Sequence, residues 1–141
     1  MKYFAWAMVS LGLLTAVPMA AHAQDPPSRS RVELGQNYPN PFNPETTIPF
    51  QLDADMFASG QRPVVSLRIY NVLAQLVAVP ILQGSGEPLD NVRLDWNGSG
   101  RYSAYWDGKV IGSNREAASG VYVYQLVVNG ERVTRKMTIV K

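Results

Sequence analysis

The chain has 141 residues, of which 46% are hydrophobic and 17% are charged, a composition typical of one globular domain with a modest core. Its formal net charge of +2 gives no electrostatic reason to expect binding to nucleic acid. The absence of cysteine excludes disulfides, thiolate catalysis and cysteine-based zinc sites.

Residues 1–23 have the pattern of a secretory signal peptide. Lys2 precedes an apolar run over residues 3–17, and Ala21 and Ala23 are the small residues that signal peptidase recognises. We therefore expect delivery by the Sec machinery and cleavage after Ala23. The alternative is an uncleaved membrane anchor, but Ser10, Gly12, Thr15 and Pro18 interrupt the apolar segment and leave it marginal for spanning a bilayer.

Processing would change the chemistry that the chain can offer. The only histidine, His22, leaves with the signal peptide, and loss of Lys2 leaves 12 of the 13 basic residues against 11 acidic ones, a net charge of +1. Without histidine or cysteine the commonest general base and nucleophile are missing, so we expect no enzymatic activity, no cofactor and no metal. Residues 24–33 begin QDPPSRSR, which predicts a flexible leader.

Residues 34–52, LGQNYPNPFNPETTIPFQL, combine a proline-rich arm with a strand. Prolines fix φ and bias the preceding residue toward extended geometry, which predicts a rigid, polyproline-like arm over residues 37–43. Tyr38 and Phe42 would thereby gain fixed directions. The alternation of Ile48, Phe50 and Leu52 then predicts the first strand, with one buried face.

The middle of the chain predicts further strands. Residues 65–70 alternate between apolar and polar, residues 71–74 form a turn, and residues 76–79 complete a hairpin. A short extra strand is expected around Val92 to Trp96, before the turn at residues 97–98. Tyr102, Ala104 and Trp106 share one face of the next strand, and we expect Trp106 at the centre of the core.

The last two strands form the hairpin with the clearest turn sequence. Residues 121–128 are rich in β-branched and aromatic residues, the turn Asn129-Gly130 favours a tight hairpin, and residues 132–140 follow it. About seven strands, without an amphipathic helix in the processed chain, predict an all-β fold, an antiparallel sandwich. The side chains expected in its core include Phe50, Trp106, Tyr122, Tyr124 and Met137.

Several of these segments match one protein family in order. The motifs are YPNPFNP at residues 38–44, VSLRIYNVLAQLV at 65–77, WDGK at 106–109, SGVYVYQL at 119–126 and RKMTIVK at 135–141. Residues 34–141 thus resemble the type A C-terminal sorting domains of type IX secretion, which are immunoglobulin-like export modules. They are also similar to the Ig-like domain of flagellar hook-capping proteins. The resemblance implies an Ig-like or fibronectin-like β-sandwich.

The resemblance also implies a function and a set of recognition residues. An outer-membrane type IX translocon would read the module, and its terminal strand in particular, after Sec export. The protein would pass through the periplasm to the cell surface or the medium, with surface attachment as one outcome. The recognition residues that the family motifs imply are Pro39, Asn40, Pro41, Gly120, Tyr122, Arg135, Lys136 and Lys141. The family usually has glycine where this chain has Ala74, and an alanine with positive φ would cost on the order of 1 kcal/mol.

Other readings of the residues stay open. The main alternative is a stand-alone secreted Ig-like domain with a structural or binding role, as an adhesin or a carbohydrate-binding module. Aromatic side chains that could stack on a sugar are Tyr70, Trp96, Tyr102 and Tyr105, although core packing explains most of them. Oxygen ligands for calcium could come from Asp90, Asn91, Asp95, Asn97 and Asp107, but turns prefer the same residue types.

Two further patterns have ordinary explanations as well. A glycosidase pair could be formed by Asp95 with Asp107 or Glu116, but such a pair needs a controlled separation that sequence does not give. The basic residues Arg132, Arg135, Lys136 and Lys141 could also be a solvated edge that discourages aggregation between strands.

Overall fold

The structure, a computed structural model, describes residues 12, 16 and 29–141 of the chain. Apart from residues 12 and 16, the expected signal peptide lies outside the described residues, as do residues 24–28 of the expected leader. No helix in the described part is long and apolar enough to cross a membrane. The elements are β1 (Val32–Leu34), β2 (Thr46–Leu52), the 3₁₀ helix η1 (Ala54–Gly60), β3 (Val64–Tyr70), β4 (Leu76–Ala78), β5 (Ile81–Leu82), β6 (Val92–Arg93), β7 (Arg101–Trp106), β8 (Gly120–Val128) and β9 (Glu131–Ile139).

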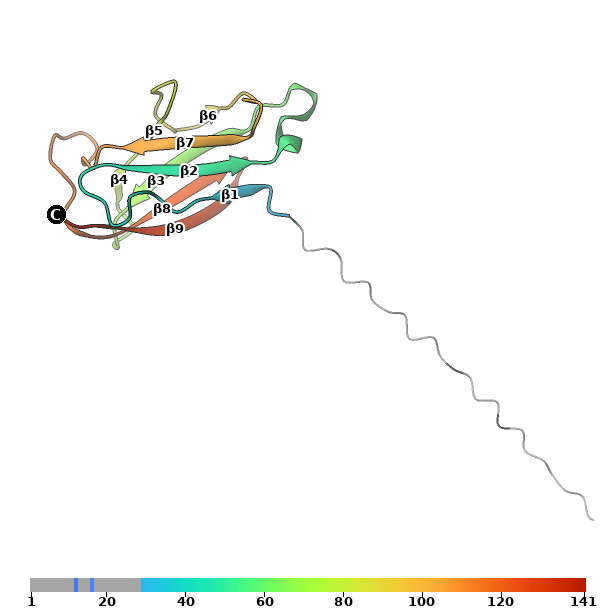
Figure 1. Ribbon diagram of the computed structural model, residues 1–141, viewed down its shortest axis with the longest axis horizontal. Helices are drawn as coiled ribbons and strands as arrows, with labels where there is room; N and C mark the ends of the chain where they lie inside the picture. The colour runs from blue at the N-terminus through green and yellow to red at the C-terminus, as the bar shows by residue number, and fades with distance from the viewer. Residues whose placement is uncertain (1–11, 13–15, 17–28) are drawn as a thin grey trace, which may run out of the picture.

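These strands form two antiparallel sheets that face one another (Figure 1). The first sheet has the strand order β1-β2-β7-β5, and the second has β4-β3-β8-β9 with β6 also paired to β3. Both long hairpin partners, β8 and β9, keep one register from Gly120↔Ile139 to Val128↔Glu131. The prediction of an all-β antiparallel sandwich is therefore confirmed.

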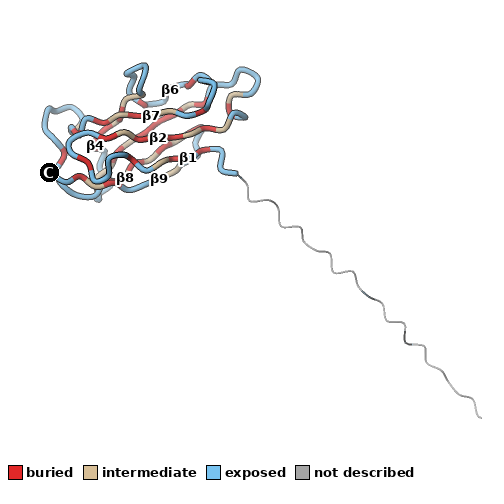
Figure 2. Tube along the Cα trace, in the orientation of Figure 1, coloured by how far each residue is buried: buried red, intermediate tan, exposed pale blue. Residues whose placement is uncertain are grey.

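The core lies between the sheets and follows from the alternation in the sequence. Every second residue of β2 is buried, and β8 alternates in the same way from Tyr122 to Val128. The inner faces of both sheets contribute to one apolar cluster, seen as alternating buried segments along the strands (Figure 2). The five side chains expected in the core are all buried, namely Phe50, Trp106, Tyr122, Tyr124 and Met137.

Two expectations about local structure were wrong. The described residues form nine strands where about seven were expected, because β5 and β6 have only two residues each and β1 has three. Residues 54–60, for which no element was expected, form η1, whose first turn is capped by the Asp53 side chain accepting from the Asp55 N–H. The expected leader over 24–33 ends earlier, since Val32 and Glu33 belong to β1, which makes β2 the second strand.

The proline-rich arm is also different from the expected polyproline-like segment. Residues 35–45 form bends and two isolated bridges, Tyr38↔Thr47 and Phe42↔Ile139, and the bonds preceding Pro39, Pro41 and Pro44 are cis. Tertiary contacts determine this shape, because the arm crosses from the first sheet to the last strand of the second. Phe42 is buried and Tyr38 is exposed.

The turns place glycine where backbone geometry requires it. Asn129 and Gly130 have φ of 49° and 85°, as expected for a two-residue hairpin turn of this sequence. At Gly108 a Cβ atom would lie 2.0 Å from the Pro44 carbonyl oxygen, so only glycine lets the end of β7 approach the arm.

Candidate functional site

The strand β9 lies at the edge of the second sheet, so one of its two hydrogen-bonding sides has no neighbouring strand. It pairs with β8 on one side only, and in a tight antiparallel hairpin alternate residues direct their N–H and C=O groups outward. Contacts with the arm identify which residues these are: Thr138 and Lys136 bond outward, so Thr134 and Arg132 face the same way. The outward row of β9 is therefore Arg132, Thr134, Lys136 and Thr138.

The arm covers one end of this outward row. The Phe42 N–H donates to the Thr138 carbonyl oxygen at 3.1 Å, and the Thr138 N–H donates to Asn40 Oδ1 at 3.1 Å. The Val140 N–H donates to the Phe42 carbonyl oxygen at 3.2 Å. Next to them, Gln36 Nε2 donates to the Lys136 carbonyl oxygen at 3.0 Å. The edge near the C-terminus is thus already occupied by the protein's own chain.

The other end of the outward row is open. Within the part of the chain that the structure describes, the N–H and C=O groups of Arg132 and Thr134 have no hydrogen-bond partner on their outward side. We call these two residues the open section of β9. Unpaired backbone groups at a sheet edge are a template for another extended chain.

Two side chains from the inner face of the second sheet hold β1 and the start of the arm. The Tyr124 hydroxyl donates to the Gly35 carbonyl oxygen at 2.7 Å and accepts from the Asn37 N–H at 3.1 Å. Arg135 Nε donates to the Leu34 carbonyl oxygen at 2.5 Å. Burial of Tyr124 raises the pKa of its hydroxyl above the ordinary value of 10.0. These hydrogen bonds connect the edge of the first sheet at β1 to the second sheet.

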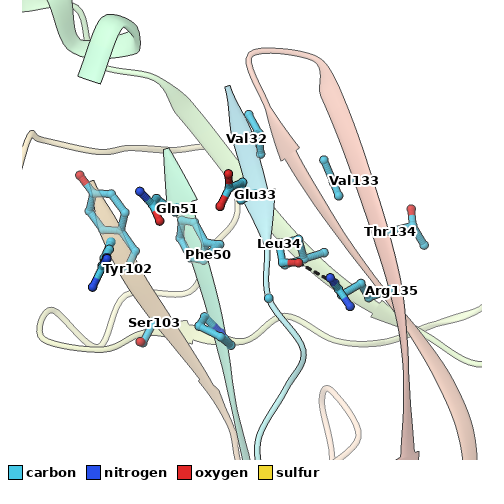
Figure 3. A pocket seen from close by; sticks show the side chains of 13 residues that line it. Val32, Glu33, Leu34, Phe50, Gln51, Tyr102, Ser103, Val133, Thr134 and Arg135 are labelled. Carbon is cyan, nitrogen blue, oxygen red and sulfur yellow. Dashed lines mark hydrogen bonds between the residues drawn. The ribbon is translucent and has the colours of Figure 1, made fainter. Parts of the chain in front are cut away.

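Beyond these hydrogen bonds lies a groove with a volume of about 800 Å³. It extends from β9 past the edge strand β1 to β2 and β7, and we call it the β1–β9 groove after the two edge strands that it joins (Figure 3). The lining residues are Val32, Glu33, Leu34, Gly35, Pro49, Phe50, Gln51, Arg101, Tyr102, Ser103, Val133, Thr134 and Arg135. Figure 3 shows the side chains of Val133 and Val32 between β9 and β1, whereas Thr134 and Glu33 lie on the far sides of these strands, and the bond from Arg135 to Leu34 lies further along. Of the open section of β9, Thr134 lines the groove.

An aromatic cluster supports the arm from below. Phe42 meets Trp106 edge to face with ring centroids 5.5 Å apart, and Trp106 meets Tyr122 at 6.0 Å. Trp106 Nε1 donates to the Lys109 carbonyl oxygen, and the Tyr122 hydroxyl donates to the Ala118 carbonyl oxygen. Burial raises the pKa of Tyr122. The arm is thus anchored on the core by Phe42.

The residues implied by the family motifs fall in two regions. Pro39, Asn40 and Pro41 are exposed on the arm, where Asn40 caps β9. Lys136 is exposed on β9, and Arg135 reaches across to β1.

The remaining three lie around the start of β8. Gly120 opens the strand with φ of 148°, and Tyr122 is buried. The Lys141 N–H donates to Ser119 Oγ at 3.1 Å, and its ammonium lies 3.5 Å from a Glu116 carboxylate oxygen. The structure thus brings the arm and the C-terminal hairpin together, although they are distant in sequence.

Two residues of this region, Thr134 and Gln36, are marked by no pattern in the sequence. Arg132 is apparent there only as one of four basic residues. A hairpin register counted from the Asn129-Gly130 turn would have marked Arg132 and Thr134 as outward-facing. The contact from Gln36 to Lys136 spans 100 residues, and no local pattern predicts it.

The candidate calcium ligands are engaged elsewhere. Asp90 and Asp95 form ion pairs with Arg68 and Arg62, each with a shortest N to O distance of 2.7 Å. The Asn97 side chain accepts from the Gly100 N–H within its own turn. Asn91 Oδ1 lies 3.2 Å from Ser66 Oγ, and Asp107 Oδ1 accepts from the Lys109 N–H. Among the described residues no three acidic or histidine side chains gather as metal ligands.

The candidate glycosidase carboxylates also have local partners. Asp95 pairs with Arg62 and Glu116 with Lys141, while Asp107 caps its own turn. These contacts account for all three side chains as parts of loops and strand ends.

The candidate sugar-stacking aromatics do not share one surface. Trp96, at 44% exposure, packs on Phe57 with centroids 5.2 Å apart, and Phe57 stacks on Tyr102. Tyr102 donates to the Asp95 carbonyl oxygen at 2.5 Å, and burial raises its pKa.

The other two aromatics lie elsewhere. Tyr105 donates to Glu45 Oε2, a contact that raises its pKa. Tyr70 lies on β3 in the second sheet.

Comparison with known proteins gives a fold similarity alone. No protein-family model and no curated protein matches the chain. Among solved structures, the Pseudomonas fluorescens alkylpurine DNA glycosylase AlkC, bound to DNA containing an abasic site analog, is similar with a TM-score of 0.50 and 14% identity. The match covers 81% of this chain and 32% of that one, so the chain spans about a third of the glycosylase.

This similarity corrects one expectation. The chain was expected to have no enzymatic activity, and that expectation is contradicted because the similar fold occurs in an enzyme. At 14% identity the match establishes the fold alone, and DNA binding is a property of the glycosylase.

Proposed function

We propose that the protein is an export module with an Ig-like sandwich, read by an outer-membrane type IX translocon after Sec export and removal of residues 1–23. The observation that carries this proposal is the open section of β9. The last strand of the chain is a basic edge strand, and its outward backbone groups at Arg132 and Thr134 are unpaired among the described residues. A translocon subunit can recognise such an edge by adding a strand to it.

The ordered sequence motifs support the same proposal. YPNPFNP lies in the arm that caps β9, and SGVY and RKMTIVK form the hairpin β8 and β9. The motifs of the resembled family thus meet at one side of the fold, with the arm holding the terminal strand rigid. In this proposal the protein reaches the cell surface or the medium.

The test is surface display of the full chain. An epitope inserted between Gly84 and Ser85, an exposed turn, leaves both termini native. In a host with a type IX translocon we expect the epitope on intact cells or in the medium. A matched host that lacks the translocon should retain it in the periplasm. The mass of the exported protein should correspond to a chain that begins at Gln24, because signal peptidase recognises small residues such as Ala21 and Ala23 before its cleavage site.

Two results would contradict the proposal. Folded, stable protein that stays in the periplasm of the translocon host favours a stand-alone Ig-like binding domain. An intact Met1 to Lys141 mass in the membrane fraction would show an uncleaved anchor. Truncation after Asn129 is a poor control, because it removes Met137 and Ile139 from the core.

A further inference from the structure

The open section of β9 is an unpaired stretch of sheet edge. Five outward groups there have no partner among the described residues, namely the N–H and C=O of Arg132 and of Thr134 and the N–H of Lys136. An added strand would lie about 4.7 to 4.9 Å from β9, on the side where Thr134 lines the groove. The Asn129-Gly130 turn limits the row at one end and Gln36 limits it at the other. The site therefore fits a short extended segment of about five residues.

The two faces of β9 differ in what they offer such a segment. Val133 lies on the inner face and lines the groove together with Val32 of β1. A side chain of the added strand that points inward would meet these apolar groups. The neighbouring side chains of the added strand would point to the outer face of the second sheet.

That outer face is positively charged along β9. Arg132 and Lys136 are exposed there, and neither forms an ion pair with any described residue. Their cross-strand partners on β8 are Val127 and Val123, which do not neutralise them. The acid Glu33, on β1, also lines the groove. Residues placed opposite Arg132 and Lys136 should therefore be acidic.

A second copy of this chain fits the edge badly. Antiparallel pairing of two β9 strands centred on Thr134 would place Arg132 of each copy opposite Lys136 of the other. Like charges directly opposite each other destabilise a strand pair. The same charges therefore disfavour self-association and favour an anionic partner.

We propose that the open section of β9 binds an extended peptide segment in which acidic and apolar residues alternate, added to the second sheet as a strand beside β9. As a segment of the export machinery it rests on the proposed function, but the binding itself can be measured separately. The backbone of Arg132 and Thr134 holds the peptide, Val133 faces its apolar residue, and Arg132 and Lys136 face its carboxylates.

The test measures binding of short labelled peptides to the full chain. Fluorescein-labelled Glu-Val-Glu-Val-Glu should bind, and the matched Lys-Val-Lys-Val-Lys should bind at least about tenfold more weakly, as measured by fluorescence anisotropy. Hydrogen exchange should slow at the amides of Arg132 and Thr134 when the acidic peptide is bound.

Two variants separate the backbone from the charge. Thr134→Pro removes an outward N–H without removing a bond to β8, so it should weaken binding about tenfold relative to Thr134→Ala, which keeps that N–H. The double variant R132E/K136E leaves the backbone intact and should reverse the preference toward the lysine peptide. Thermal unfolding of each variant checks that it is folded.

Several outcomes would overturn the inference. These are equal binding of both peptides, equal binding by folded Thr134→Pro and Thr134→Ala, and unchanged exchange at Arg132 and Thr134. Dimerisation that is lost in Thr134→Pro would show that a second copy occupies the edge instead. Peptide binding without surface display would contradict the proposed function alone, whereas surface display that survives Thr134→Pro together with no peptide binding would contradict this inference alone.

Discussion

At the scale of single residues, Trp106 and Ala74 show how much one position contributes. Trp106, at 3% exposure, fills the space between the arm and β8, where its indole N–H also finds a partner. Ala74 lies in the turn after β3 with φ of 59°, a region that side chains with a Cβ adopt at a cost. The first residue stabilises the fold, and the second costs stability.

We expect Trp106→Ala to lower the free energy of unfolding by about 3 to 5 kcal/mol, since it removes a buried indole and leaves a cavity. Urea denaturation measures the change. Trp96→Ala, at a half-exposed position, is the control and should lose less. A loss below about 1 kcal/mol for Trp106→Ala would contradict the central position of this side chain.

Ala74→Gly should raise the free energy of unfolding by about 1 kcal/mol, because glycine adopts positive φ without a Cβ clash. Ala58→Gly is a matched control at φ of −59° in an exposed turn, where glycine brings only its entropy cost and should destabilise. Equal effects of the two substitutions on the denaturation midpoint would show that backbone conformation at Ala74 carries no strain.

At the scale of elements, the Tyr124 hydroxyl on β8 connects the second sheet to the start of the arm by two hydrogen bonds. Tyr124→Phe removes the hydroxyl that serves Gly35 and Asn37, of which Asn37 is buried. We expect a loss of about 1 to 3 kcal/mol, the cost of unsatisfied buried backbone groups. Tyr122→Phe, whose hydroxyl serves the exposed Ala118, should lose less in the same denaturation series. The reverse order would contradict this assignment.

Elements with a clear alternation were predictable from the sequence, and elements made by tertiary contact were not. The strands β2, β7, β8 and β9 follow from their alternating residues, and the last hairpin follows from Asn129-Gly130. The three residues of β1 are too few to show a period. The arm takes its shape from Phe42 against Ile139 and Asn40 against Thr138, and proline propensity alone predicted a different conformation.

The site was predictable to a similar extent. The basic terminal strand followed from the sequence, because its composition and its place after a tight turn are local features. The sequence does not predict which part of this edge is open, because the rest is covered by Gln36 and Asn40. These residues are separated in sequence from Lys136 and Thr138, which they contact, by 100 and 98 residues. Such side-chain partners leave no periodic trace.

At the scale of the whole molecule, the raised pKa values of three tyrosines predict how the free energy of unfolding depends on pH. Burial raises the pKa of Tyr102, Tyr122 and Tyr124 above the ordinary value of 10.0. Each tyrosine keeps its proton to a higher pH in the folded state than in the unfolded state. Its contribution to stability is therefore complete below its pKa in the unfolded state and is lost as the pH rises through its pKa in the folded state.

The urea midpoint should therefore hold up to about pH 9 and fall above about pH 10. Tyr124→Phe should show a shallower fall, because one raised tyrosine is gone. A midpoint that rises with alkaline pH, or equal slopes for the two proteins, would contradict this account.

We also expect the stability of the whole molecule to be independent of metal ions, because the acidic loop residues already bond to arginines and to their own turns. Thermal unfolding with EDTA and with added calcium measures this. An increase of several degrees with calcium would show a binding site around residues 90–107.

The contacts between β1, the arm and β9 also determine when the fold can be completed. The Arg135 side chain donates a hydrogen bond to the Leu34 carbonyl oxygen across 101 residues. This contact between β1 and β9 can form only when both residues are available. Contacts between residues so far apart in sequence slow folding, because a long loop must close first. The contact between β1 and β9 is therefore expected to be among the last to form, after the local hairpins.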